Sequence, residues 1–501
     1  MVHAFEGLQR GMFSNANPSL IPDGYLSNCR NSDLNTYGMV VKAKGRTSSA
    51  SGLTSGRNRR LAFFAPDGGA KTLLTFQNGD LWTWPNSGTW AQVTGATGLA
   101  DEPVDIVQGD NKAFLIKQAE VIRYYDGTTV TAFTDTNTDP PRTKVGIYML
   151  GWLLLANSAA ANDGLYFGAN GSPATGWNRT SNLLRIGKGE GGDITGLAQW
   201  TAQDLIVFKE QAIYAVTINS ATPANWTITP ITSDIGTPCG RTAVQFGSDF
   251  LFLAGDGIRS LLQSEQDKKR GAALAITEPI RDFIDTINWQ YAKDVACAVE
   301  WKGQYYCSVP ISPNQVNSHT IVYNPRNGSL DIRNYGFSDF SVGRFSSVPT
   351  LFSSYGATTG GVNTEESTFN DNGTAIAWTV ETKRINGPNG QAWPHLWKRG
   401  GELEVFFEST GSYVVAVSAA VDGGSYTSLG NVTLTGTLPT LPIDLPFSLA
   451  DQNITKAKFN LSRMGRFRDI QFKFTTSDAG AEVKLIRAVA SLLPMAYTRD
   501  A

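Results

Sequence analysis

Cysteine and histidine are scarce in this sequence, and their scarcity excludes several kinds of site. Four cysteines in 501 residues are too few for a disulfide framework. The three histidines stand far apart, so their spacing marks no zinc site and no histidine-based triad. We therefore expect no metal and no disulfide, with the cysteines reduced and packed in the core.

Long apolar runs and net charge are also missing. No run reaches the ~18 residues that a membrane helix needs, and the first residues show no secretion signal, so we expect assembly in a cytoplasm. Only 17% of residues are charged and the net charge is −2, so any contact with nucleic acid must come from a local patch. In contrast, the 51 glycines, 22 prolines and 11% aromatic residues are typical of an all-β chain rich in turns.

The cysteines closest in sequence, Cys297 and Cys307, are predicted not to pair. A two-residue hairpin turn at 302–303 would place Cys297 opposite Ser308 and Cys307 opposite Ala298. Because successive side chains of a strand alternate, the two sulfur atoms would then face opposite sides of the sheet.

A repeated pattern of short strands is clearest in residues 194–262. Each unit has four short runs of β-branched or aromatic residues, separated by glycine, aspartate or asparagine. The units recur at roughly 40–45 residues, the period of a β-propeller blade. One blade cannot bury both of its faces, so the blades must close into a ring. Similar units from residue 61 to about residue 361 predict a propeller of six or seven blades.

One short helix is predicted inside this repeat, over residues 277–287. Thr277 can cap it and Pro279 suits its first turn. Apolar residues recur at helical spacing along one face: Ile280, Phe283, Ile284 and Ile287.

The chain is predicted to have three parts. Beyond about residue 370 the strands lengthen and lose the blade period, and alternation such as that of 470–474 indicates a β-sandwich. We assign 1–50 to an N-terminal segment that closes or decorates the ring, 51–365 to the propeller and 366–501 to the sandwich. A strand ending near Val41 is expected to supply the outer strand that closes the ring.

Motifs for catalysis or cofactors are not convincing. The glycine pattern at 187–192 is followed by a strand and not by the helix that a dinucleotide site needs. The calcium-like residues 135–139 lack the required glycine and glutamate. The nearest match to a sialidase Asp-box, at 371–373, lacks its serine and tryptophan. We predict no enzyme, no catalytic residue and no cofactor.

Basic residues form the candidate site. From Lys42 to Arg60 the chain has six cations and no acid around a Gly/Ser-rich stretch, and 268–270 forms a second basic tract. Such a tract can be a mobile loop that neutralises DNA phosphates without reading sequence, or simply a solvated surface loop. The candidates for contact with DNA or with a neighbouring ring are Lys42, Lys44, Arg46, Arg57, Arg59, Arg60, Lys268, Lys269 and Arg270.

Several phrases along the chain resemble one family. They are Ile21-Pro-Asp-Gly24 leading to Asn31 and Gly38, Tyr124-Tyr-Asp-Gly127, Leu165-Tyr-Phe167 followed by Trp177-Asn178, Leu205-Ile-Val-Phe-Lys-Glu210 with Ile213-Tyr214, Gly255-Asp-Gly257-Ile258, Val322-Tyr-Asn324 and Gly465-Arg-Phe-Arg-Asp-Ile-Gln-Phe-Lys-Phe474. Together they resemble the tail hub or nozzle proteins of short-tailed bacteriophages, which include packaged-DNA stabilisation proteins.

The resemblance implies a structural protein of the virion tail, assembled in the host cytoplasm. Such proteins form a homohexameric ring below the portal and its adaptor ring, continue the channel for double-stranded DNA, and contact tail fibres, a spike or a plug. They help to retain and eject the genome. Some relatives are considerably longer than this chain, and the family offers no catalytic motif to transfer.

Two alternatives remain from the sequence. A carbohydrate-binding or hydrolysing propeller, such as a receptor-binding tail protein, would need paired carboxylates and exposed tryptophans, for which Trp82, Trp84 and Trp90 form the dense cluster. A bacterial surface adhesin would need an export signal, which these first residues do not show.

Overall fold

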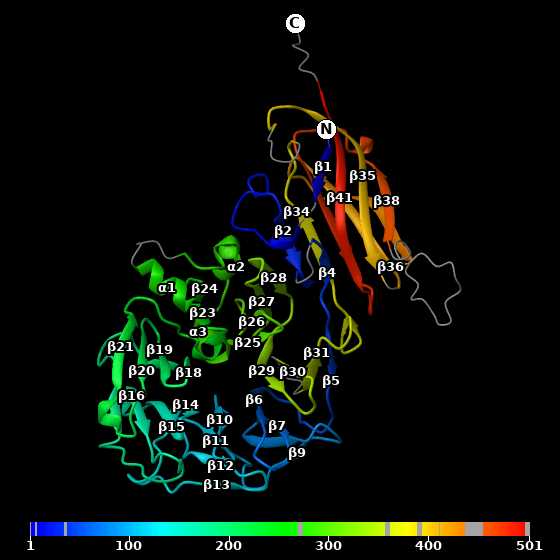
Figure 1. Cartoon of the computed structure of the whole chain (residues 1–501). Coiled ribbons are helices and arrows are strands. Elements are labelled where there is room, and N and C mark those ends of the chain that lie inside the picture. The colour runs from blue at the N-terminus through cyan, green and yellow to red at the C-terminus, as the bar shows by residue number, and fades with distance from the viewer. Residues whose placement is uncertain are drawn as a thin grey trace.

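The fold is described from a computed structural model of the chain. The structure describes residues 2–5, 8–34, 38–268, 274–355, 361–387, 393–409, 411–435 and 454–495. It is mostly β, with 51% of residues in strands and 6% in helices, and it combines a propeller with a C-terminal sandwich (Figure 1). The predicted fold class is therefore confirmed.

Four blades of the propeller are continuous in sequence. Each is an antiparallel sheet of four strands joined by short turns. Their strands are β6 (Asn58–Phe64), β7 (Thr72–Gln77), β8 (Asp80–Trp84) and β9 (Ala91–Gln92); β10 (Asp105–Gly109), β11 (Lys112–Ile116), β12 (Arg123–Tyr125) and β13 (Val130–Ala132); β14 (Thr143–Met149), β15 (Trp152–Ser158), β16 (Ala161–Phe167) and β17 (Leu183–Arg185); and β18 (Ile194–Gln199), β19 (Asp204–Lys209), β20 (Ile213–Thr217) and β21 (Thr227–Thr232).

Two further four-stranded blades are parts of larger sheets. With them, the described residues form six four-stranded blades. One is formed by β25 (Cys297–Trp301), β26 (Gln304–Val309), β27 (His319–Asn324) and β28 (Ser329–Arg333). The other is formed by β29 (Phe337–Gly343), β30 (Thr350–Tyr355), β31 (Val362–Glu365) and β5 (Arg46–Ser48). A smaller sheet of three strands completes the circle: β22 (Val244–Phe246), β23 (Asp249–Ala254) and β24 (Gly257–Ser260).

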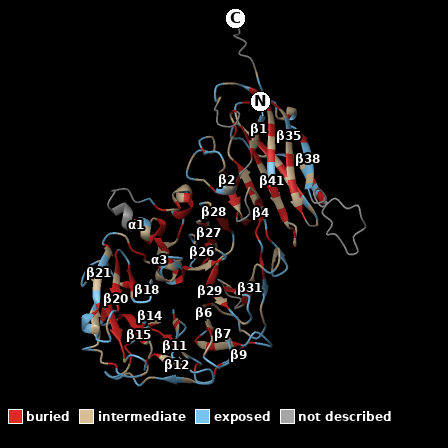
Figure 2. Cartoon of the chain, viewed as in Figure 1, coloured by how far each residue is buried: buried red, intermediate tan, exposed pale blue. Residues whose placement is uncertain are grey.

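The first strands of these sheets are neighbours around the ring. The order runs β6, β10, β14, β18, β25, β29 and back to β6, with β22 and the 3₁₀ turn η3 (Gly240–Thr242) between β18 and β25. The second strands are the most buried, and every residue of β15 is buried because neighbouring blades cover both of its faces (Figure 2).

The ring is closed by a strand from the N-terminal segment, but not by the predicted one. The strand that ends near Val41, β4 (Val40–Lys42), pairs with the sandwich strand β41 (Val483–Pro494). The next strand, β5, pairs with β31 and becomes the outer strand of the last blade. Between them Gly45 lies so close to the carbonyl oxygen of Asn370 that a Cβ would clash, so the chain crosses from sandwich to propeller at a tightly packed point.

The inserted helical region is shorter and more broken than predicted. Residues 277–287 form a 3₁₀ turn, η4 (Glu278–Ile280), and one helical turn, α2 (Arg281–Ile284). The predicted apolar face is buried, but the Thr277 hydroxyl accepts the N–H of Ile258 at 3.0 Å and does not cap the helix. Two more helices flank it, α1 (Leu261–Lys268) and α3 (Trp289–Val295). No helix of the described residues is long and apolar enough to cross a membrane.

The sandwich has two sheets. One contains β1 (Val2–Phe5), β3 (Ser32–Asp33), β4, β35 (Lys398–Ser409), β38 (Ile454–Asn460), β39 (Arg466–Phe467) and β41. The other contains β2 (Leu26–Arg30), β34 (Trp378–Thr382), β36 (Ser412–Val421), β37 (Thr427–Thr435) and β40 (Ile470–Thr476). Alternate side chains meet between them, such as Phe407 and Phe474, whose rings are 6.0 Å apart.

The second sandwich sheet is continuous with a propeller blade. Strand β2 pairs with β28 in parallel, at Arg30 and Ile332, and with β34 in antiparallel fashion. The result is one nine-stranded sheet, β25-β26-β27-β28-β2-β34-β40-β36-β37. Hydrogen-bonded strands, and not a flexible linker, therefore join the two parts (Figure 1).

The predicted cysteine hairpin is confirmed. Cys297 lies opposite Ser308 and Cys307 opposite Ala298. The turn residues Lys302 and Gly303 both have positive φ, 52° and 78°, as a two-residue hairpin turn requires. All four cysteines are buried and free.

Candidate functional site

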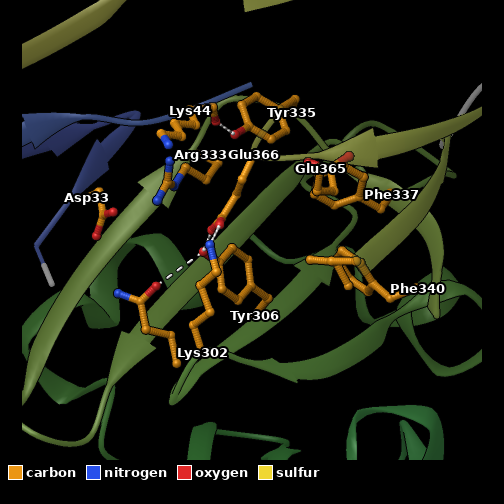
Figure 3. Close-up of a pocket in the computed structure, with 12 residues that line it drawn as sticks. Asp33, Lys44, Lys302, Tyr306, Arg333, Tyr335, Phe337, Phe340, Glu365 and Glu366 are labelled. Atoms are coloured by element: carbon orange, nitrogen blue, oxygen red, sulfur yellow. Dashed lines mark hydrogen bonds and ion pairs between the residues drawn. The ribbon is translucent and has the colours of Figure 1, made fainter. Parts of the chain in front are cut away.

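A small cavity lies where the last two blades meet the N-terminal segment. Its volume is about 140 Å³, which is below the range of about 300–1,000 Å³ that is usual for ligand sites. Charged and aromatic side chains line it (Figure 3): Asp33, Lys44, Lys302, Gln304, Tyr306, Arg333, Tyr335, Phe337, Phe340, Leu351, Glu365 and Glu366.

Two consecutive glutamates reach this cavity because the backbone turns sharply between them. Glu365 ends strand β31, and Glu366 has φ of 54°, in the left-handed region. In a regular strand the two side chains would point to opposite faces. Glu366 pairs with Lys302 (Figure 3) and accepts a hydrogen bond from the hydroxyl group of Tyr306 at 3.2 Å. Glu365 accepts a hydrogen bond from Ser353.

The environments of the two glutamates differ in a way that separates their pKa values. Burial raises the pKa of Glu365 to about 7, although the nearby Arg46 opposes this. Burial acts on Glu366 too, but hydrogen bonding and the charge of Lys302 outweigh it and lower the pKa. Near neutral pH, one carboxyl group can thus exchange a proton beside a second one that stays ionised.

The cations on the cavity wall differ in how they are held. Arg333 forms a buried ion pair with Asp331 at 2.8 Å. Burial raises the pKa of Asp331 to about 6 despite this partner. Lys302 is more than half exposed, at 57%, and Lys44 is also exposed. The cavity therefore offers donors and acceptors to a small polar molecule.

Two of the predicted DNA contacts are instead buried structural residues. The ammonium group of Lys42 donates to the carbonyl oxygen of Asp478 at 2.9 Å, and burial lowers its pKa to about 8. Arg46 is 2% exposed and makes two hydrogen bonds to Asp371, at 2.7 and 2.9 Å. Neither residue lies on a loop, because Lys42 is the last residue of β4 and Arg46 is the first residue of β5.

Two more of these cations are paired at one end of the propeller channel. Arg59 makes two hydrogen bonds to the carboxylate of Asp101, at 3.0 and 2.9 Å. Arg60 lies 3.1 Å from Asp105 and 3.6 Å from Asp339. These ion pairs could not be expected from residues 42–60 alone, because that stretch contains no acid and the partner acids come from other parts of the ring.

The remaining predicted cations differ in burial and in their neighbours. Arg57 is half-buried and has no acid partner among the described residues, and Lys44 lies 5.7 Å from the ring of Phe369. Lys268 is the last residue of α1, while Lys269 and Arg270 lie outside the described residues.

One ion pair at this end of the propeller joins two positions of the ring that are not adjacent. Arg241, in η3, and Asp339, in β29, are separated on the ring by strand β25, yet their side chains meet at 2.7 Å.

Two tryptophans of the predicted cluster are core, and Trp82 is partly buried against them. Trp84 and Trp90 are 5% and 3% exposed and stack on each other at 5.9 Å. Phe345 and Phe352 cover them from the last blade. These rings are therefore not available to stack on a sugar.

Sequence reasoning missed the cavity. Its one signal in the sequence is the pair Glu365-Glu366, two adjacent acids in a chain with only 17% charged residues. Among the described residues, no group of three or more His, Cys, Asp or Glu side chains is placed to hold a metal ion.

Comparisons with known proteins give little beyond the fold. No protein-family model matches the chain, and no curated protein matches it significantly. Among solved structures, the chain is similar to the computationally designed Ika8 protein (TM-score 0.35, 9% identity, 64% of this chain and 99% of the other). It is also similar to the C-terminal WD40 domain of Sif2 (0.34, 12%, 61% and 81%) and to an exo-β-1,3-galactanase from Phanerochaete chrysosporium (0.27, 10%, 89% and 100%). Such distant likenesses carry no argument about activity.

Proposed function

We propose that this chain is a structural subunit of a bacteriophage tail, where six copies form a hub or nozzle ring below the portal and adaptor rings. The sequence resemblance to tail hub and nozzle proteins is the reason for proposing this assembly. The structural observation that carries the proposal is the nine-stranded sheet that runs from a propeller blade through β2 into the sandwich. A subunit whose parts share one sheet can transmit force between neighbouring rings without a hinge.

The N-terminal segment adds to this rigidity. Strands β1 and β4 pair with β41 in the sandwich, and β5 completes the last blade. The same segment therefore ties both parts together at several points. In this proposal the protein acts as a scaffold and not as an enzyme, within the virion tail and after assembly in the host cytoplasm.

The proposal also specifies where DNA would pass. In this proposal the duplex runs through a lumen between subunits and not through the propeller of one subunit. The sandwich and the outer blade edges are then the surfaces available for portal or adaptor proteins and for fibres, a spike or a plug.

Electron microscopy of the purified protein and of the virion tests this function. We expect closed six-fold rings of the protein, and density for the propeller and sandwich on the tail axis. Mass spectrometry of purified virions should detect the chain. A protein that stays monomeric when mixed with portal and adaptor, and that is missing from virions, would contradict the proposal.

A second function, carbohydrate binding or hydrolysis, is favoured only by the Glu365 and Glu366 pair in the cavity. If it holds, oligosaccharides should bind the wild-type protein in calorimetry, and Glu366→Gln should weaken binding by about tenfold through loss of a charged hydrogen bond. A glycan array that shows no binding for the wild-type protein would exclude this function. The Trp84 and Trp90 core makes no contribution to it.

A further inference from the structure

One arginine at the end of the propeller channel lacks a counter-charge. Arg57 immediately precedes β6, and no described residue forms an ion pair or hydrogen bond with its side chain. Its Nε atom is covered by protein and has no hydrogen-bond acceptor. The side chain as a whole is only partly buried, so a solute can reach the guanidinium from the solvent side.

The neighbouring arginines are all paired. Arg59 lies 2.9 Å from Asp101, Arg60 lies 3.1 Å from Asp105, and Arg241 lies 2.7 Å from Asp339. These arginines and their acid partners lie near the N-terminal ends of the first strands of the blades. They therefore share one end of the channel. Three acids for four arginines leave Arg57 as an excess positive charge.

The electrostatic environment of Arg57 is unfavourable to its charge. Burial, followed by the charges of Arg59 and Arg241, lowers its pKa to about 10. The group is still protonated at neutral pH. A partly desolvated cation without a partner costs free energy, and an anion that accepts from its N–H groups would offset that cost.

We propose that this end of the propeller channel is a binding site for a small oxyanion, with Arg57 as the residue that contacts it and Arg59 and Arg241 as the source of positive potential. The guanidinium fork suits the oxygens of phosphate. A dianion gains more than a monoanion from the uncompensated positive charge of Arg57.

The site is independent of the proposed tail function. Inorganic phosphate is the probe, tested by isothermal calorimetry and thermal unfolding at constant ionic strength, with acetate and chloride for comparison. We expect phosphate to bind and stabilise the wild-type protein. Arg57→Gln should weaken phosphate binding by about tenfold or more, as expected for loss of a charged hydrogen bond.

Two further variants distinguish binding from folding. Arg399→Gln removes an exposed arginine of the sandwich and should bind phosphate like the wild-type protein. Arg57→Lys keeps the charge but loses the fork, so its affinity should lie between those of wild type and Arg57→Gln. The inference is overturned if the wild-type protein binds no phosphate, if Arg57→Gln binds it unchanged, or if acetate binds as tightly as phosphate.

Discussion

Replacing Arg46 with methionine should destabilise the protein by about 3 kcal/mol, because it leaves the Asp371 carboxylate without its buried partner. Arg46 is 2% exposed and holds Asp371 by two hydrogen bonds. Its guanidinium also lies 4.1 Å from the ring of Tyr355 and 5.1 Å from that of Phe337. Urea-induced unfolding of both proteins would measure the loss.

The location of Arg46 explains why the effect should spread beyond one residue. It lies in β5, the strand that closes the ring, directly opposite Glu365 of β31. Burial alone would lower the pKa of Arg46, but Asp371 and Glu365 outweigh it and raise the pKa. Removing this cation should therefore loosen the closing strand and, with it, the last blade.

Three controls separate the ion pair from general damage. Arg399→Met, at an exposed position, should change stability by less than about 0.5 kcal/mol. Arg46→Lys should recover only part of the loss, because it cannot bond both carboxylate oxygens. The double variant Arg46→Met/Asp371→Asn should be more stable than Arg46→Met alone. An Arg46→Met protein as stable as wild type would refute the structural role.

The role of Arg46 could not be predicted from local sequence. Its partner Asp371 is 325 residues away, far outside the basic tract that ends at Arg60. Ion pairs between blades depend on how the ring closes, which no local pattern encodes. The same reason applies to Arg59 and Arg60.

Features set by local geometry were predictable. The glycine in the turn at 302–303 suits the positive φ of a tight hairpin, and that turn fixes the Cys297 register. The blade period and the alternation in 470–474 likewise indicated propeller and sandwich. Pairings of the N-terminal strands with β28, β31 and β41 were not predictable, because their partners lie hundreds of residues away.

The cavity depends on an unusual backbone conformation. A positive φ is uncommon for glutamate, so no pattern in the sequence predicts that Glu366 lies on the same side as Glu365. The helical region shows a related limit: the apolar spacing of Ile280 and Ile284 predicted the buried face, but not where tertiary contacts end the helix.

The stability of the protein should depend on pH through these two glutamates, with opposite signs. The pKa of Glu365 is raised from its ordinary 4.5 to about 7. A raised pKa contributes stability that is complete below about pH 4.5 and is lost as the pH rises through about 7. The pKa of Glu366 is lowered, so its contribution is present above its ordinary value and is lost as the pH falls. Asp331, with a pKa raised to about 6, acts in the same direction as Glu365.

Glu365→Gln should therefore stabilise the protein at pH 8 by on the order of 2 kcal/mol, with little effect at pH 4, because the amide cannot ionise. The stabilisation is smaller than the full pKa shift would give, because solvent can enter the cavity that Glu365 faces. Urea unfolding at both pH values measures the difference. The adjacent variant Glu366→Gln is the matched control and should be less stable than wild type at pH 8, since it loses the bond to Lys302. If Glu365→Gln keeps the wild-type pH profile, or if both variants shift stability in the same direction, the electrostatic separation of these carboxyl groups is refuted.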